Sequence, residues 1–422
     1  MSAEPSAASL RSACEAPARV VGFSLFDGDL VNRLFGALGL GPWRPLHLLG
    51  RAAVLVALTW LPTAILSLWT TRPHPGAPRL SASFFTDFAA YAQFLIGLPL
   101  FVLAEAIVGP TTRQADQMFA QTGVVRRADL RRLAALRARI ARLRDTPWAD
   151  LAALALGGAL SAAIIATELR HPQTTTWHTY VAHGWRRLSA PGYWEFLVAL
   201  PLLNYWWLRQ VWKVILWCIY LHGVSRLRLT LVATHPDRTG GIGFISQVQG
   251  HFAWLILAYG VSNVAATVGY ELTVEHAQLW IPPVWGPIAG FAVGAPLLFL
   301  LPLFMFTRQL YRTKRRARRL YRQRVIEQVR LFERDVLPLS TVERTSMPAA
   351  IDLQLMTRFS DLFERCEEMR IVPFDFRSMG ELFAAVIGTI ASILPAQQLA
   401  KILPQAVGVV RGIVGFLAHG AH

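Results

Sequence analysis

Long apolar runs alternate with shorter polar segments along most of the chain. A run of about 20 apolar residues is typical of a transmembrane helix, because a bilayer has a hydrocarbon core about 30 Å thick. We therefore predict an all-α polytopic membrane helix bundle with about six transmembrane helices and a cytoplasmic helical tail. The predicted spans are 46–69, 84–108, 148–167, 193–222, 244–268 and 281–307.

The segments before and between the first spans are polar or amphipathic. Residues 1–45 predict a disordered N-terminus followed by an interfacial helix, in which Leu30, Leu34 and Leu38 recur at helical spacing. Residues 111–147 carry nine arginines among regularly spaced leucines, which predicts a basic cytoplasmic helix. This helix is expected to lie on the inner leaflet or on the tail, and a specific site for anionic lipids is the alternative.

The predicted tail, residues 308–422, opens with a very basic helix, and a second amphipathic helix follows at about 350–370. Two apolar segments come later, at 380–394 and 405–418. Each is short for a membrane span, so an interfacial, a re-entrant and an inter-subunit placement all stay open.

The third predicted span, 148–167, is rich in alanine and glycine. Small side chains let helices approach one another closely in lipid. We therefore expect this helix to be buried within the bundle.

Composition and charge agree with a membrane protein. The chain is 54% hydrophobic and only 16% charged, with a mean hydropathy of +0.38. The net charge is +16, yet no groove-reading motif appears, so we expect no nucleic-acid partner.

The distribution of Lys and Arg explains the excess positive charge. The segments 1–45, 109–147, 223–243 and 308–422 carry 4, 9, 3 and 18 of them, whereas the loops of the opposite side carry 5. The positive-inside rule then predicts a protein of the bacterial inner membrane with both termini cytoplasmic, whose partners are the bilayer and its anionic inner-leaflet lipids.

Motifs for metal binding or catalysis are missing from the sequence. Cys14, Cys218 and Cys366 form no CxxC pair, and His178 and His183 have poor spacing for a metal site. We predict no metal, no cofactor and no catalytic residue. An enzyme is therefore the weaker class, and its best version would be a lipid-modifying enzyme that uses His235 and Asp237.

The most distinctive polar stretch is the loop Thr234–Phe244, THPDRTGGIGF, between the fourth and fifth spans. One interpretation is a tight turn in which Asp237 accepts backbone N–H bonds and the glycines take left-handed conformations. The other is that His235, Asp237 and Arg238 line a cytoplasmic vestibule and bind an ion or gate a pore. The candidate loop residues are His235, Asp237, Arg238, Gly240, Gly241 and Gly243.

Two known loop families are excluded. The HPD letters alone match the J-domain of co-chaperones, but a membrane helix follows here, and the glycine run lacks the Lys-Ser/Thr of a P-loop. The pattern HPD-x-x-GG-x-GF, followed by Pro373–Phe374–Asp375, resembles a family of uncharacterised bacterial polytopic inner-membrane proteins. The resemblance covers about residues 190–380 and implies no activity.

Several polar side chains fall within the predicted spans. An ionisable group in the membrane is costly and is a functional candidate by default. One interpretation is snorkelling plus a structural ion pair, in which Glu105 contacts Arg209 or Lys213. The other is a polar path that favours anions. The candidate path residues are Glu105, Asn204, Arg209, Lys213, Gln247, His251 and Asn263.

These features support two hypotheses from different functional classes. The first is a homo-oligomeric channel or transporter for an ion, with a slight preference for anions, or for a small solute. The second is a membrane-anchored scaffold or signalling protein whose helical tail binds a partner. A continuous hydrated path would favour transport, whereas a tightly packed bundle with its charges in ion pairs would favour the scaffold.

Overall fold

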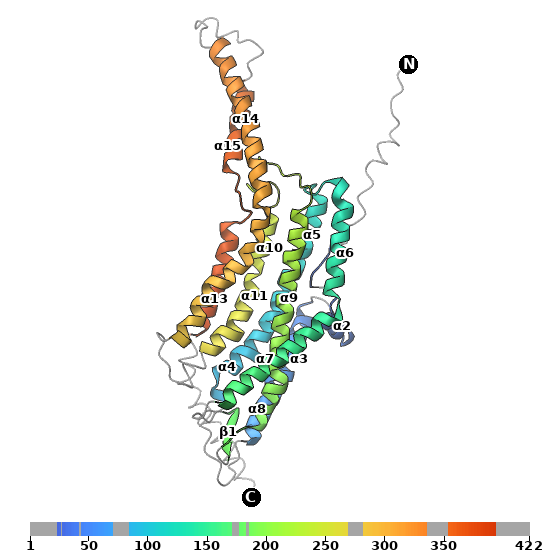
Figure 1. Ribbon diagram of the computed structural model, residues 1–422, viewed down its shortest axis with the longest axis vertical. Coiled ribbons are helices and arrows are strands. Elements are labelled where there is room, and N and C mark those ends of the chain that lie inside the picture. Colours follow the sequence, from blue (N-terminus) through green and yellow to red (C-terminus); the bar gives the residue numbers. More distant parts are fainter. Residues whose placement is uncertain are drawn as a thin grey trace, which may run out of the picture.

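The computed structural model describes residues 23–26, 28–41, 44–70, 84–170, 177–182, 185–268, 282–335 and 353–393. Nearly all of these residues are helical, as Figure 1 shows. The α-helices are α2 Leu30–Ala37, α3 Pro45–Thr70, α4 Phe88–Ala90, α5 Leu98–Gln121, α6 Leu130–Arg144, α7 Pro147–Arg170, α8 Ala190–Trp194, α9 Leu200–Ser225, α10 Phe244–His251, α11 Ala253–Tyr259, α13 Pro282–Leu300, α14 Thr307–Asp335 and α15 Leu353–Glu368.

Short segments of other helix types join these helices. The π-helices are η3 Tyr91–Gly97, η5 Glu195–Ala199 and η6 Gly260–Ala265, and the 3₁₀ segments are η2 Phe84–Thr86, η4 Arg127–Asp129 and η7 Leu301–Phe306. Two short strands, β1 Thr179–Ala182 and β2 Trp185–Leu188, pair antiparallel. The predicted segments 1–20 and 405–418 lie outside the described residues.

Six helices among the described residues are long and apolar enough to cross a membrane, which confirms an all-α polytopic bundle and an integral membrane protein. They are Pro45–Trp69, Phe88–Gln121, Pro147–Arg170, Phe244–Val268, Trp285–Arg330 and Phe376–Ile393. The last of them was not among the predicted spans.

The predicted span 193–222 is also helical, within the continuous run from α8 through η5 to α9. It is absent from the six because its polar and tryptophan-rich sequence is less apolar. Its polar residues Arg209 and Lys213 are nevertheless 3% and 2% exposed. The run is therefore a central helix of the bundle that faces other helices more than lipid.

The helices run roughly along one long axis (Figure 1). In this view α10 and α11 lie between α13 and α9, and α6 stands beside the upper part of α9. The helices α14 and α15 pair into a hairpin that projects from one end of the bundle, while β1 lies at the opposite end. The helix 376–393 returns from the base of this hairpin alongside α13.

The basic segment 111–147 was predicted to form one helix, but the structure divides it between two helices. Residues 111–121 continue α5 through Pro110, and the separate helix α6 begins at Leu130. A proline removes only one backbone donor, and the hydroxyls of Thr111 and Thr112 bond to the carbonyls of Val108 and Gly109. Helix α6 then buries Leu133 and Ile140.

The prediction that 148–167 is buried is wrong for most of helix α7. Only Gly157 and Ser161 are buried, and the other small side chains lie at the outer surface of the bundle. A Cβ on Gly157 would lie 3.0 Å from the backbone nitrogen of Tyr205, so this glycine permits close packing on α9. Helix α7 approaches α9 closely along one face only, and composition alone does not reveal which small residues lie on that face.

The helix 376–393 packs tightly against the fifth span. A Cβ on Gly250 would lie 2.3 Å from Glu381 Oε2, and one on Gly260 would lie 2.1 Å from Thr389 Oγ1. Two glycines thus form the surface on which this helix rests. Intimate packing through small residues is the usual basis of helix association in lipid.

Enlarging Gly260 tests this contact. Gly260→Ala is expected to lower the free energy of unfolding by about 1–3 kcal/mol, because the added methyl overlaps Thr389. Thermal unfolding of the purified protein in detergent measures the change. Gly290→Ala is the matched control, since nothing lies within 4 Å of a Cβ there, and equal losses from both variants would contradict the assignment.

Candidate functional site

Four charged side chains meet in the interior of the bundle. Arg209 Nη1 lies 2.6 Å from Glu105 Oε1, and Lys213 Nζ lies 3.0 Å from the same oxygen. Asp29 accepts from Arg209 Nε at 3.0 Å and lies 3.0 Å from Lys213 Nζ. We call these residues, together with Gln210, which donates to Glu105, the ion network.

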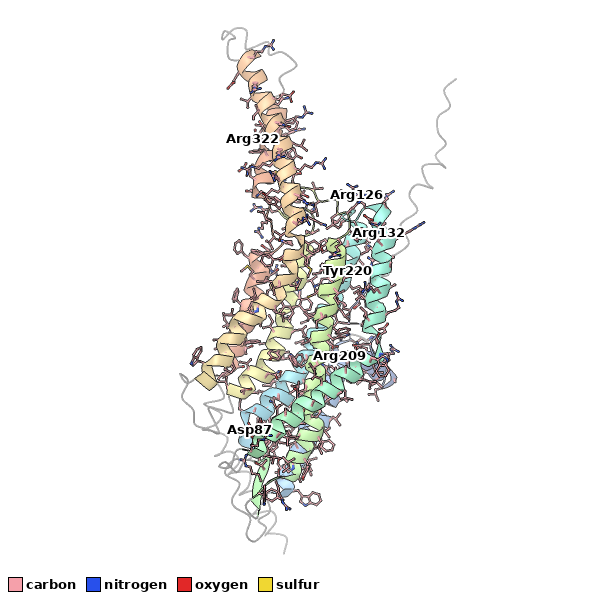
Figure 2. The ribbon with its side chains drawn as sticks, in the orientation of Figure 1. Asp87, Arg126, Arg132, Arg209, Tyr220 and Arg322 are labelled. Atoms are coloured by element: carbon pink, nitrogen blue, oxygen red, sulfur yellow. The ribbon has the colours of Figure 1, made fainter. Side chains whose placement is uncertain are left out.

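Three separate parts of the chain build the ion network. Arg209 and Lys213 are four residues apart on one face of α9, and Glu105 comes from α5. Figure 2 marks Arg209 within the bundle. Asp29 is the N-cap of α2, where its Oδ1 accepts the backbone N–H of Asn32 while its Oδ2 faces the cations. The network therefore ties the N-terminal segment, α5 and α9 together.

The environment of the ion network is apolar and closed to solvent. The four charged side chains are between 2% and 4% exposed, and aromatic rings flank the cations at 5.0 Å (Trp206) and 4.8 Å (Phe26). Burial acts to raise the pKa of the Asp29 carboxyl, but Lys213 and Arg209 outweigh it and hold that pKa below its usual range. Two carboxylates and two cations balance, as a structural ion cluster requires.

Arg51 extends the polar interior toward α3. Its Nη1 donates to Asn32 Oδ1 at 2.7 Å, and its Nε and Nη2 donate to the carbonyl of Leu40. The side chain is only 3% exposed. It therefore fixes α2 against the start of α3 and does not snorkel to the headgroups.

The remaining four residues of the predicted polar path lie elsewhere. Asn204 Nδ2 donates to Ser161 Oγ on α7 at 3.1 Å. Gln247, His251 and Asn263 follow one another along the fifth span, outside the ion network. The structure thus gathers three of the seven predicted residues, Glu105, Arg209 and Lys213, and adds Asp29 and Gln210.

The outward side of the fifth span is unusually polar. Gln247 and Thr267 are exposed, and His251 and Asn263 are partly exposed. The spacing of four residues places Gln247 beside His251 near one end of the span and Asn263 beside Thr267 near the other, and the segment between the two pairs exposes Trp254. The run of about twenty residues from Gln247 to Thr267 spans about 30 Å. We call these four residues the polar stripe.

The loop 234–243 is organised by the Asp237 carboxylate. Its two oxygens accept the backbone N–H groups of Thr239 at 2.9 Å, Gly241 at 3.0 Å and Gly243 at 2.9 Å. Burial acts to raise the pKa of Asp237, but these N–H donors outweigh it and lower that pKa. The carboxylate therefore has the turn-forming contacts that the sequence suggested.

The three loop glycines serve different ends. Gly240 and Gly241 have φ of 72° and 95°, as expected for left-handed positions. Gly243 instead has φ −60°, and a Cβ there would lie 2.9 Å from Thr239 Oγ1 and 3.1 Å from Asp237 Oδ2. The prediction of a left-handed Gly243 is therefore wrong, because this glycine makes room for the carboxylate.

The loop joins the bundle to the α14–α15 hairpin. The carbonyl of Arg238 accepts the N–H of Arg370 at 2.7 Å, and Arg238 Nε lies 3.3 Å from Glu368. A Cβ on Gly240 would lie 3.2 Å from Met369 Cε. Within the hairpin, Lys314 Nζ on α14 donates to the carbonyls of Glu367 and Met369. We call the loop and residues 365–378 the joint.

The Pro373–Phe374–Asp375 motif lies in the same joint. The N–H of Asp375 donates to Ser246 Oγ at 2.8 Å, and that hydroxyl donates to Ser378 Oγ at 3.1 Å. Arg370 Nη1 also bonds to Asp375 at 3.1 Å. The two motifs form one pattern in the sequence, and the structure brings them together in the joint, which the sequence alone did not predict.

A pocket of about 330 Å³ opens between the loop and the last turn of α15. It is lined by His235, Pro236, Arg238, Arg365 and Glu368. His235 Nδ1 lies 2.8 Å from Asp237 Oδ1, which orients the ring. Two of the six predicted loop residues, His235 and Arg238, thus line this recess, here called the joint pocket.

At the end of the bundle near β1, a second buried pair was missed by the sequence analysis. His178 Nε2 lies 3.0 Å from Glu195 Oε2, and Asp87 accepts from Trp177 Nε1 at 2.8 Å. Burial acts to lower the pKa of His178, but Glu195 outweighs it and raises that pKa. Among the described residues, no three His, Cys, Asp or Glu side chains gather as a metal site would need.

The ion network makes a stability prediction. Glu105→Gln leaves Arg209 and Lys213 with a single carboxylate, so the free energy of unfolding is expected to fall by about 3–5 kcal/mol. Adding Lys213→Met should restore part of the loss. Glu327→Gln, which removes the exposed partner of Arg324, should change little in the same thermal unfolding assay. An equally mild effect of Glu105→Gln would contradict a structural role.

The Asp237 carboxylate predicts a pH dependence. Its folded pKa is lowered, so its contribution to loop stability is present above the ordinary Asp pKa and is lost as pH falls through the folded value. Hydrogen exchange of the N–H groups of residues 239–243 is expected to show weaker protection at acidic pH. In Asp237→Asn, protection should be weak at every pH. Unchanged protection in that variant would contradict the capping role.

Comparison with models of protein families, with curated proteins and with solved structures finds no match for this chain.

Proposed function

We propose that this integral membrane protein forms a homo-oligomeric channel or transporter for an ion or small solute in the bacterial inner membrane. The observation that carries the proposal is the polar stripe. Polar side chains in a membrane span normally face the bundle interior or a water-filled cavity. Within one protomer the polar stripe lies on the outside of the bundle, so we assign it to a surface shared with other copies.

The contrast with the neighbouring span supports this assignment. The outward side of α13 presents Val293, Leu297 and Leu298, at 70%, 51% and 55% exposure, as expected for contact with lipid tails. The fifth span also exposes Trp254, but near its two ends it presents amide, imidazole and hydroxyl groups. In this proposal α13 faces lipid and the polar stripe faces the axis of the oligomer.

The ion network takes a different part in the proposed function. Its charges are paired with each other and closed to solvent, so it holds α5 and α9 in place and conducts nothing. The route for the solute therefore moves from the interior of the protomer to the polar stripe. This assignment keeps Gln247, His251 and Asn263 and sets Glu105, Arg209 and Lys213 aside as structural residues.

Charge suggests the orientation and a slight preference for anions. Helices α6 and α14 are rich in arginine and lie toward one end of the bundle (Figure 2). We place this end in the cytoplasm, following the positive-inside rule, where the arginines also face anionic inner-leaflet lipids. A basic mouth concentrates anions and repels cations.

Flux through reconstituted liposomes tests the proposal. The protein is expected to pass chloride or another small anion faster than protein-free vesicles, and His251→Leu with Asn263→Leu should reduce the flux by about tenfold or more. The control Val293→Ala on the lipid face of α13 should leave it unchanged. Cysteines at 247 or 267 should form disulfide-linked dimers, whereas cysteines at 293 should not. Absent flux together with absent cross-linking would overturn the proposal.

A scaffold or signalling role is the second candidate, and the hairpin favours it. The basic face of α14 carries exposed arginines whose side chains bond to no other described residue: Arg308, Arg312, Arg315, Arg316, Arg319 and Arg322. The closed ion network also meets the criterion stated above for a scaffold. Cross-linking through the stripe without flux would favour this role, in which the membrane part oligomerises and the hairpin binds an acidic partner.

A further inference from the structure

We infer that the joint pocket is a binding site for a phosphate-bearing anion. Three of its five lining side chains, His235, Arg238 and Arg365, are basic, and Glu368 is the acidic one. Arginine and histidine are the donors that recognise phosphate oxygens, and arginine can do so with two parallel hydrogen bonds. The inference is independent of transport, because it concerns a cytoplasmic pocket outside the polar stripe.

Of the two arginines in the pocket, Arg238 pairs with Glu368, and Arg365 is available to bind a ligand. Arg238 Nε lies 3.3 Å from Glu368, and that contact is more than 40% exposed on both sides. Arg365 forms no hydrogen bond or ion pair with another described residue, although it lines the pocket beside Glu368. A ligand phosphate would satisfy Arg365 and compete with Glu368 for Arg238.

The backbone holds Arg238 in a conformation that its side chain disfavours. Its φ is 55°, and it is the one non-glycine residue with positive φ among those described. Such a residue costs on the order of 1 kcal/mol or more and persists where the surrounding structure imposes it. Here the Asp237 cap on one side and the Arg370 N–H on the other fix the turn, so Arg238 is presented at the pocket before a ligand arrives.

The pocket lies between two parts of the molecule. His235 and Arg238 precede α10, which begins the fifth span, and Arg365 and Glu368 end α15. The segment after α15 leads through Asp375 into the helix 376–393. An anion bound across the pocket would therefore stabilise the hairpin against the membrane bundle.

Titration of pyrophosphate into the full-length protein in detergent tests the site, at constant ionic strength. Wild type is expected to bind with saturation, and Arg365→Gln should weaken binding by about tenfold or more, as expected for loss of a charge-assisted hydrogen bond. Arg358→Gln, an exposed arginine two turns earlier on α15, is the matched control and should bind as wild type.

Two further variants separate binding from folding. Arg238→Gly suits the positive φ and so should keep the loop folded, yet it should lose most of the affinity. Glu368→Gln should tighten binding several-fold, because it removes the competing acid. A purely structural role for the joint predicts weaker binding in both.

A second arm distinguishes a soluble ligand from a lipid headgroup. Protein in vesicles that contain phosphatidic acid is compared with protein in vesicles of phosphatidylcholine alone. If phosphatidic acid abolishes pyrophosphate binding in wild type and in the control Arg358→Gln, the anion is a lipid headgroup, and equal binding in both vesicles assigns a soluble phosphate. Failure of wild type to bind in detergent and in both vesicles, or equal binding by Arg365→Gln and Arg358→Gln, would overturn the inference.

Discussion

The cost of burying charge in a membrane bundle organises much of this structure. Arg209 and Lys213 lie in the middle of α9, where an unpaired cation would cost several kcal/mol. Asp29 and Glu105 offset that cost only if α2 and α5 are held against the same face of α9. The requirement therefore fixes three distant segments at once. It also explains why these polar residues, which look like a transport path in the sequence, are closed to solvent.

Two kinds of polar residue in the spans can now be separated by their surroundings. The charged residues of the ion network pair with each other within one protomer, so they need no partner from outside it. Members of the polar stripe, such as Gln247 and Thr267, are exposed on the outside of the bundle. Thr267 donates to the carbonyl of Asn263 at 2.7 Å, whereas lipid offers no hydrogen bond to the exposed amide of Gln247, which calls for a second protein surface or for water. The proposed oligomer follows from this difference in environment.

The joint links the membrane bundle to the α14–α15 hairpin by backbone and side-chain contacts together. Asp237 shapes the loop, Arg238 contacts the end of α15, and Ser246 holds the start of the helix 376–393 through Asp375. Through these contacts the loop 234–243 fixes the position of α15 and of the helix 376–393 relative to the bundle. The loop is a structural turn that also lines the joint pocket, so the proposed ligand would act on the position of the hairpin relative to the bundle. The two interpretations drawn from its sequence are compatible.

The sequence alone determined the class of protein, because long apolar runs reflect bilayer thickness directly. It also determined the Asp237 turn, whose contacts are local. Partners across the bundle were beyond it: Asp29 reads as a polar residue before a short helix, and its place beside Arg209 appears only when α2 packs on α9. Likewise, the sequence did not predict that the helix 376–393 packs on the fifth span, because this contact depends on the close approach at Gly250 and Gly260. Contacts between residues close in sequence can be predicted from the sequence, whereas contacts between distant helices depend on how the whole chain packs in three dimensions.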